Sequence, residues 1–148
     1  MGVIGEGLNG GMKMGECRGA VCLHDAVLRE IAETEHEIRF VFQLMEQADG
    51  QGGQRTVALH GCTADDFSCY FVRRYAPCHR ALRISRAVEL AELQNMLHAG
   101  KWLELIDEFY GEGQLYWRLA VKPWKKRGLG PEVTMQAEGY EEIRVEGR

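Results

Sequence analysis

Residues 102–122 read WLELIDEFYGEGQLYWRLAVK, and this stretch decides the fold class. Two apolar runs, 102–110 and 114–122, flank a three-residue link that contains two glycines. A short link of this kind between two apolar runs is typical of an antiparallel β-hairpin. The apolar residues of the second run recur at every second position, namely Leu115, Trp117, Leu119 and Val121. This spacing indicates one buried strand face, and Pro123 ends the strand.

Residues 27–44 show the same alternation on both sides of the polar segment 34–37, which reads TEHE. A period of two predicts a second hairpin here. A helix over residues 25–35 is the alternative, because Glu, Arg and Ala all favour helices. We favour the hairpin, because residues 39–44 (RFVFQL) have a strand-like composition and need an antiparallel partner nearby.

Further strands are predicted at residues 17–23, 56–62, 67–75, 82–85, 132–137 and 140–145. The first range is short and apolar, residues 67–73 are rich in aromatic and β-branched residues, and the last two ranges alternate weakly. Residues 86–99 instead carry apolar side chains at helical spacing, with Ser85 placed as the N-cap and Gly100 placed to end the helix. We therefore predict an α+β fold, mainly an antiparallel β-sheet built from hairpins, with one principal α-helix at about residues 86–99.

The length of 148 residues fits a single domain, and 45% hydrophobic with 27% charged residues is typical of globular proteins. We expect a flexible glycine-rich leader over residues 1–15 and a single α+β domain over residues 16–148. The sequence shows neither a signal-peptide pattern nor an apolar stretch long enough to span a membrane. Its five cysteines form no C-x-x-C pair, which favours reduced thiols and a cytoplasmic location.

The net charge of −4 is distributed in blocks. Residues 70–86 hold five arginines and no acid, and residues 122–127 hold four bases and no acid. These blocks suggest nucleic-acid contact through Arg73, Arg74, Arg80, Arg83, Lys125, Lys126 and Arg127. Against this, the rest of the chain is acidic and contains no recognised nucleic-acid-binding motif. Solvated loops and cross-strand partners for the glutamates explain the same residues, and we favour that interpretation.

Four residues are weak candidates for a polar site: His24, Asp25, His79 and Asp107. The pair His24-Asp25 could bind a divalent metal, but we favour a turn made by Asp25 before a strand. His79 follows Cys78, and neighbours on a strand point to opposite faces, so this adjacency indicates no nucleophile–base pair. No catalytic residue is assigned.

Asp107 is the most informative of the four. In a regular strand it shares one face with Leu103, Leu105 and Phe109, while Glu104 and Glu108 share the other face. An acid on an apolar face can have a raised pKa, which is a mark of acid–base catalysis. The plain alternative, which we favour, is a strand end at which Asp107 either reaches solvent or pairs with Arg118 across the hairpin.

A zinc site would need ligands from Cys17, Cys22, His24 and one of Cys62, Cys69 or Cys78 with His79. These spacings lack the tight pairs that zinc sites use, and buried free cysteine is the favoured interpretation. We predict no metal and no cofactor.

These observations favour a small non-enzymatic interaction module that binds a protein partner or a second copy of itself. The motivating feature is the number of aromatic residues on predicted strands: Phe40, Phe42, Tyr70, Phe71, Trp102, Phe109, Tyr116 and Trp117. The alternatives are weak nucleic-acid binding through the blocks 73–86 and 122–127, or a small hydrolase or ligand-binding domain that uses Asp107, His24 or His79. No membrane association is expected.

Overall fold

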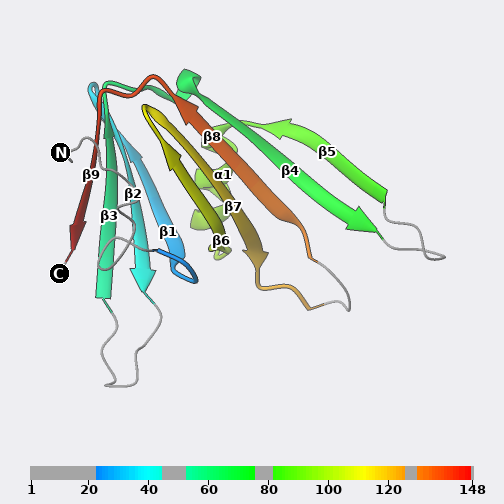
Figure 1. Ribbon diagram of the computed structural model, residues 1–148. Coiled ribbons are helices and arrows are strands. Elements are labelled where there is room, and N and C mark those ends of the chain that lie inside the picture. Colours follow the sequence, from blue (N-terminus) through cyan, green and yellow to red (C-terminus); the bar gives the residue numbers. More distant parts are fainter. Residues whose placement is uncertain (1–22, 45–52, 76–81, 126–129, 148) are drawn as a thin grey trace.

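The computed structural model describes residues 23–44, 53–75, 82–125 and 130–147 (Figure 1). These residues form one nine-stranded antiparallel sheet and one α-helix, so the predicted α+β fold is confirmed. The strands are β1 (Val27–Glu33), β2 (Glu37–Leu44), β3 (Gly53–His60), β4 (Phe67–Tyr75), β5 (Leu82–Val88), β6 (Trp102–Gly111), β7 (Gln114–Lys122), β8 (Glu132–Glu138) and β9 (Glu142–Gly147). The helix is α1 (Leu90–His98), and a 3₁₀ turn covers Ala64–Asp66.

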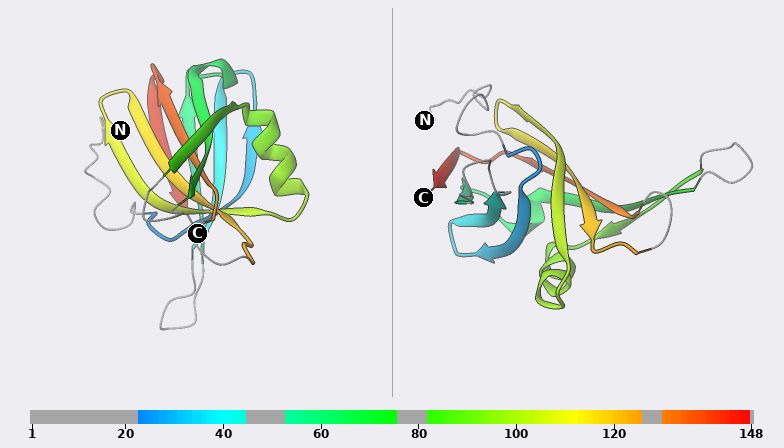
Figure 2. Two further views of the ribbon diagram at one scale, coloured as in Figure 1. Left: turned by 90° about the vertical axis from the view of Figure 1, so that its right-hand side faces the viewer. Right: turned by 90° about the horizontal axis from the view of Figure 1, so that it is seen from below.

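The strand order across the sheet is β5-β4-β8-β7-β6-β1-β2-β3-β9. The two predicted hairpins, β1–β2 and β6–β7, are both present and lie next to each other. Their junction is narrow, because β1 pairs with β6 only at Val27↔Glu104 and Leu28↔Leu103. The sheet is strongly curved, and α1 packs against β1 and β6 (Figure 2).

The core lies on the inner face of this curved sheet. Trp117 is fully buried at its centre, and its ring makes edge contacts with Phe40 at 5.1 Å and Phe42 at 5.2 Å between centroids. Leu90 and Leu93 of α1 join the same cluster. Burial of large apolar groups from both hairpins and the helix is the main term that stabilises this fold.

Two β-bulges change which side chains point inward. One lies between Leu28 and Glu30, and the other lies between Leu105 and Asp107. A bulge adds one residue to a strand and reverses the alternation beyond it. The regular alternation expected over residues 27–33 and 102–110 is therefore wrong after each bulge: Leu28 and Ile31 are both buried, and Asp107 does not share the face of Leu105.

The helix begins four residues later than predicted. Residues 86–88 belong to β5, where Arg86 pairs with Phe71 and Val88 pairs with Cys69. The N-cap is Glu89, so the expected capping role of Ser85 is wrong. Strand pairing with β4 satisfies the backbone of residues 86–88, and this tertiary pairing overrides their helical spacing. Gly100, with φ of +98°, follows the helix end as predicted.

The boundaries of β3, β5 and β9 differ by a few residues from the predicted ranges. The predicted strand at 17–23, except Leu23, and the leader at 1–15 lie outside the described residues.

Candidate functional site

A series of hydrogen bonds between polar groups, called the polar chain below, lies beside Trp117 in the core. Trp117 Nε1 donates a 3.1 Å hydrogen bond to the hydroxyl of Tyr110, which donates a 2.7 Å hydrogen bond to Glu108. The other carboxylate oxygen of Glu108 accepts a 2.9 Å bond from the backbone N–H of Leu23. The bulge in β6 places Glu108 opposite Trp117, a position that the regular alternation did not predict. This chain ties the segment before β1 to the centre of the core.

Asp107 lies on the outer face, directly opposite Arg118 of β7. Arg118 donates to Asp107 from Nε at 2.8 Å and from NH1 to Glu132 of β8 at 2.9 Å. The hydrogen bond to Asp107 is the largest of the effects that raise the pKa of Arg118, which keeps its positive charge. Asp107 thus lies in a three-residue ion cluster and not on an apolar face.

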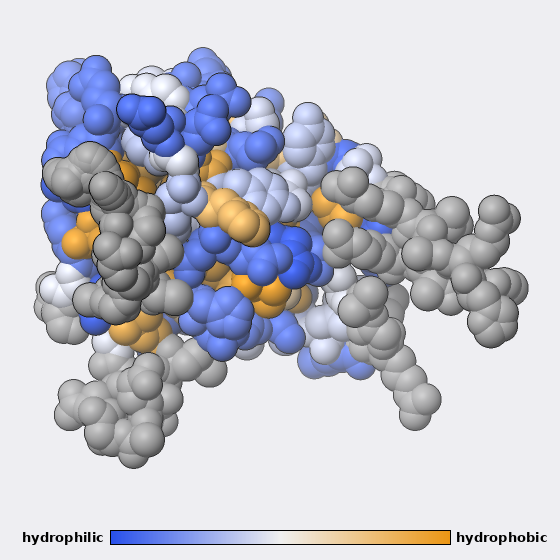
Figure 3. Space-filling model, in the orientation of Figure 1, coloured by the Kyte–Doolittle hydropathy of each residue, from blue (hydrophilic) through white to orange (hydrophobic). Residues whose placement is uncertain are grey.

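The same outer face carries one exposed and one partly buried aromatic ring. Phe109 is 63% exposed, and its ring centroid lies 6.0 Å from that of Tyr116, its cross-strand partner. A shallow hollow of about 270 Å³ opens here over β6, β7 and β8. Its lining includes the side chains of Gln114, Gln136 and Glu138. On the side of the molecule seen in Figure 3, hydrophobic side chains form small separate areas among hydrophilic ones.

His24 and Asp25 occupy an exposed turn before β1. His24 Nδ1 lies 3.2 Å from Asp25 Oδ2, and more than half of each side chain is exposed. Asp25 has φ of 72°, and its backbone N–H donates to the carbonyl oxygen of Leu105 at 2.9 Å. Asp tolerates this left-handed conformation better than most residues, which explains its place in the turn. The two side chains contact each other, whereas Asp107 contacts Arg118.

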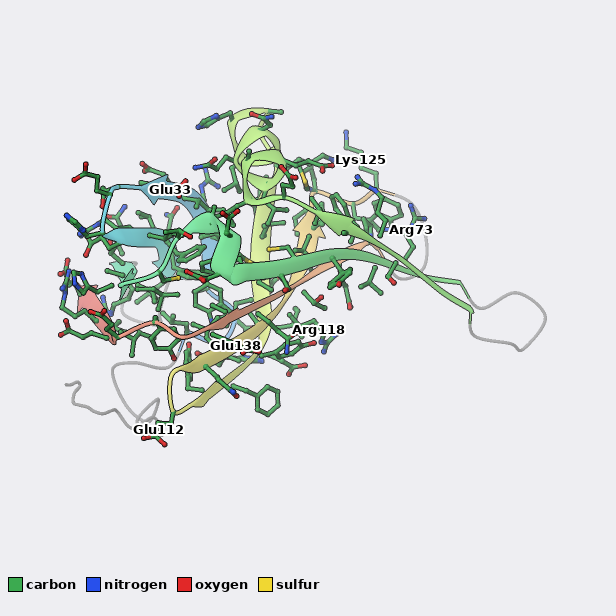
Figure 4. The ribbon with its side chains drawn as sticks, turned by 90° about the horizontal axis from the view of Figure 1, so that it is seen from above. Glu33, Arg73, Glu112, Arg118, Lys125 and Glu138 are labelled. Carbon is green, nitrogen blue, oxygen red and sulfur yellow. The ribbon has the colours of Figure 1, made fainter. Side chains whose placement is uncertain are left out.

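Described residues of the two basic blocks lie together at one end of the sheet. The guanidinium of Arg73 on β4 lies 5.0 Å above the ring of Trp124, which follows β7. Lys125 is exposed beside it, and Figure 4 shows Arg73 and Lys125 at the same end of the molecule. Arg74 pairs in register with Arg83. His79, Arg80, Lys126 and Arg127 lie outside the described residues.

Two of the cysteines proposed as zinc ligands are buried core residues. Burial raises the pKa of Cys69 to about 12, and burial together with Asp66 and Glu33 raises the pKa of Cys62 to about 11. Both are therefore neutral thiols that pack in the hydrophobic core. Within the described ranges, no group of three His, Cys, Asp or Glu side chains is arranged to hold a metal ion. Cys17, Cys22 and Cys78 fall outside those ranges.

Comparisons with protein families, with curated proteins and with solved structures find no match for this chain. The helix found in the described part of the chain is too short to cross a membrane. Any function must therefore be inferred from the surfaces of the fold.

Proposed function

We propose that this protein is a non-enzymatic interaction module that binds a protein partner through the outer face of β6, β7 and β8. The observation that carries this proposal is the position of Phe109, the most exposed large hydrophobic residue in the described part of the chain. An exposed aromatic ring beside a second ring and a hollow is a typical centre of a protein interface.

The inner face of the sheet offers a ligand less space than the outer face. Its centre is filled by Trp117 in close contact with two phenylalanine rings, and the polar chain beside it is engaged with the backbone of Leu23. The outer face combines apolar rings with amide side chains, which can bond to a partner around an apolar contact.

The charges around the hollow suggest the chemistry of the partner. Glu112 lies at the tip of the β6–β7 hairpin, and Glu138 and Arg118 lie along the neighbouring strands (Figure 4). Arg118 is already engaged with Asp107 and Glu132. The surface around Phe109 therefore has an excess of acids, and the partner is expected to present an apolar side chain flanked by basic residues.

The test is affinity capture from the native cell with three baits: the wild-type protein, Phe109→Asp and Gln43→Asp. Gln43 is an exposed residue of β2 and serves as the control for adding a charge elsewhere. We expect the wild type and Gln43→Asp to retain the same proteins and Phe109→Asp to lose them. Equal recovery with all three baits, or no specific protein with any of them, would overturn the proposal.

Light scattering on the purified wild type measures its molar mass, which tests whether the partner is a second copy of the same protein. A dimer that Phe109→Asp converts to a monomer would identify this face as a self-association surface. A dimer that persists in Phe109→Asp would place self-association elsewhere and count against this face.

A further inference from the structure

The hollow on the outer face is lined by two neighbouring rows of side chains that cross β6, β7 and β8 in register. The rows are Phe109–Tyr116–Gln136 and Gly111–Gln114–Glu138. The first row supplies two aromatic rings and an amide. The second row supplies a position without a side chain, a second amide and a carboxylate. The hollow therefore combines aromatic rings with hydrogen-bond acceptors.

Gly111 keeps the hollow open. Its φ does not lie in the left-handed region, so the backbone at this position does not require glycine. A Cβ added here would meet only the side chain of Gln114, at the ordinary van der Waals distance of 3.9 Å. Glycine weakens a strand because it has no side chain to pack and loses more chain entropy than other residues. Its effect in β6 is to leave space on the outer face near Phe109.

The lining of the hollow is acidic and contains no basic residue. Glu138 is the only charged residue in the lining, and no lysine or arginine of the described ranges pairs with it. Arg118, on the same face of β7, is bound instead to two other carboxylates. The exposed side chains of Gln114 and Gln136 likewise make no hydrogen bond to a described residue. A ligand in the hollow therefore meets three side-chain acceptors and a negative charge.

Three partly buried aromatic rings elsewhere in the described part of the chain each face an arginine of the same chain. The distances from guanidinium carbon to ring centroid are 5.9 Å for Arg29 over Trp102, 5.0 Å for Arg73 over Trp124 and 4.8 Å for Arg86 over Phe71. The rings of Phe109 and Tyr116 differ, because no described arginine or lysine lies over either of them. Their centroids are 6.0 Å apart and their planes are inclined at 45°, so they form a corner that a cation from outside can enter.

We propose that the hollow binds the guanidinium group of an arginine side chain of the partner protein, an inference that rests on the proposed function. Guanidinium is planar, stacks on aromatic rings and donates five N–H groups in fixed directions. One of its faces lies against the aromatic corner, while its N–H groups reach the carboxylate of Glu138 and the amide oxygens of Gln114 and Gln136.

The arrangement of the acceptors favours arginine over lysine. Gln114 belongs to β7, whereas Gln136 and Glu138 belong to β8, so the acceptors are spread over two neighbouring strands. A planar fork can bond to several of them at once, whereas the ammonium group of lysine acts as a compact point charge. Among the basic residues expected around the apolar contact, the one seated in the hollow is therefore arginine.

The test is an NMR titration of the isotope-labelled protein with Nα-acetyl-arginine amide. We expect saturable shifts at the amide signals of Gln114, Gln136 and Glu138, with a dissociation constant in the millimolar range that suits a single small side chain. Nα-acetyl-citrulline amide is the matched control, because it has nearly the same shape and no charge. It should bind at least about tenfold more weakly.

Two variants test the two parts of the site. Glu138→Gln should weaken binding of the arginine compound by about fivefold or more, because it removes the carboxylate. Glu112→Gln makes the same change at the tip of the β6–β7 hairpin, outside the lining, and should stay within about twofold of the wild type (Figure 4). Gly111→Val fills the hollow and should abolish binding. Urea unfolding should show that this variant is folded, since valine favours strands and the position has room for a side chain.

The inference is overturned if the arginine compound does not bind saturably, if the citrulline compound binds equally well, or if Glu138→Gln and Glu112→Gln lose equal affinity. Unchanged binding in a folded Gly111→Val variant would also overturn it, and tighter binding of Nα-acetyl-lysine amide would replace guanidinium by ammonium as the ligand. Affinity capture separates this inference from the proposed function. If Phe109→Asp loses the captured proteins but Glu138→Gln and Gly111→Val retain them, the inference alone fails. If Phe109→Asp retains them although the wild type binds the arginine compound, the proposed function fails instead.

Discussion

Glu37 on β2 and Arg144 on β9 form a 2.9 Å ion pair although strand β3 lies between them. Two further residues close this pair into a ring. Arg39 contacts Glu37 at 2.6 Å and Glu146 at 3.0 Å, and Arg144 lies 3.6 Å from Glu146. The residue of β3 between the two arginines in register is Ala58, which is 1% exposed. Its small side chain lets the longer ones meet above it, and the ring fixes edge strand β9 to the sheet.

The first prediction concerns the stability that this ring provides. Glu37→Gln should lower the free energy of unfolding by about 1 to 2 kcal/mol, because it removes the carboxylate that bridges both arginines. The estimate is modest because both guanidinium groups are about one-third exposed and are screened by water. Urea unfolding measures the change. Glu142→Gln is the control, since Glu142 is 3.8 Å from Arg144 and nearly half exposed; an equal loss in both variants would contradict the prediction.

The second prediction concerns pH. Burial raises the pKa of Glu37, but hydrogen bonds from Arg39 and Arg144 outweigh this effect, and the pKa is lower than its usual value. A depressed folded-state pKa means that the ring stabilises the protein fully above the pKa of the unfolded chain, about 4.3. This contribution is lost as the pH falls through the lower folded-state pKa. The stability difference between wild type and Glu37→Gln should therefore be large at neutral pH and smaller in acid. A pH-independent difference would contradict this account.

The sequence predicted most of the sheet because its strands alternate cleanly. The range predicted for β7 is the observed range, and there Leu115, Trp117 and Leu119 all point inward. The predicted alternation of inward and outward side chains is wrong in two places, and both are β-bulges. One extra residue there turns every later side chain of the strand to the opposite face. Nothing in the residues around Ile106 distinguishes a bulge from a regular strand, so the exchange of faces between Asp107 and Glu108 could not be predicted.

The candidate surfaces were only partly visible in the sequence. The pairing of Asp107 with Arg118 was accessible because the hairpin link sets the register of β6 and β7. The contact between Arg73 and Trp124 could not be predicted from the sequence, because it depends on β8 lying between β4 and β7 in the sheet. Strand order among distant segments is a property of the whole fold, and one sequence gives no local signal for it.

The third prediction tests the polar chain in the core. Tyr110→Phe removes the hydroxyl that links Trp117 to Glu108 and should cost about 1 to 2 kcal/mol of stability. Trp117→Ala should cost about 3 to 5 kcal/mol, because it also leaves a cavity between Phe40 and Phe42. Tyr116→Phe, on the outer face of the same strand as Trp117, is the control and should change stability by less than about 0.5 kcal/mol. If Tyr110→Phe and Tyr116→Phe lowered the free energy of unfolding in urea equally, the polar chain would contribute nothing specific to stability.

The fourth prediction concerns the two buried thiols. With pKa values of about 11 and about 12, Cys62 and Cys69 are almost wholly protonated at neutral pH, and only the thiolate reacts with a disulfide reagent. In a variant whose Cys17, Cys22 and Cys78 are serine, we expect labelling to be slow in the folded protein and rapid in denaturant. A Cys introduced as Glu30→Cys, at an exposed position of β1, gives the rate of an accessible thiol in the same fold. If the native thiols reacted as fast as this reference, they would be accessible, and the assignment of Cys62 and Cys69 to the hydrophobic core would be wrong.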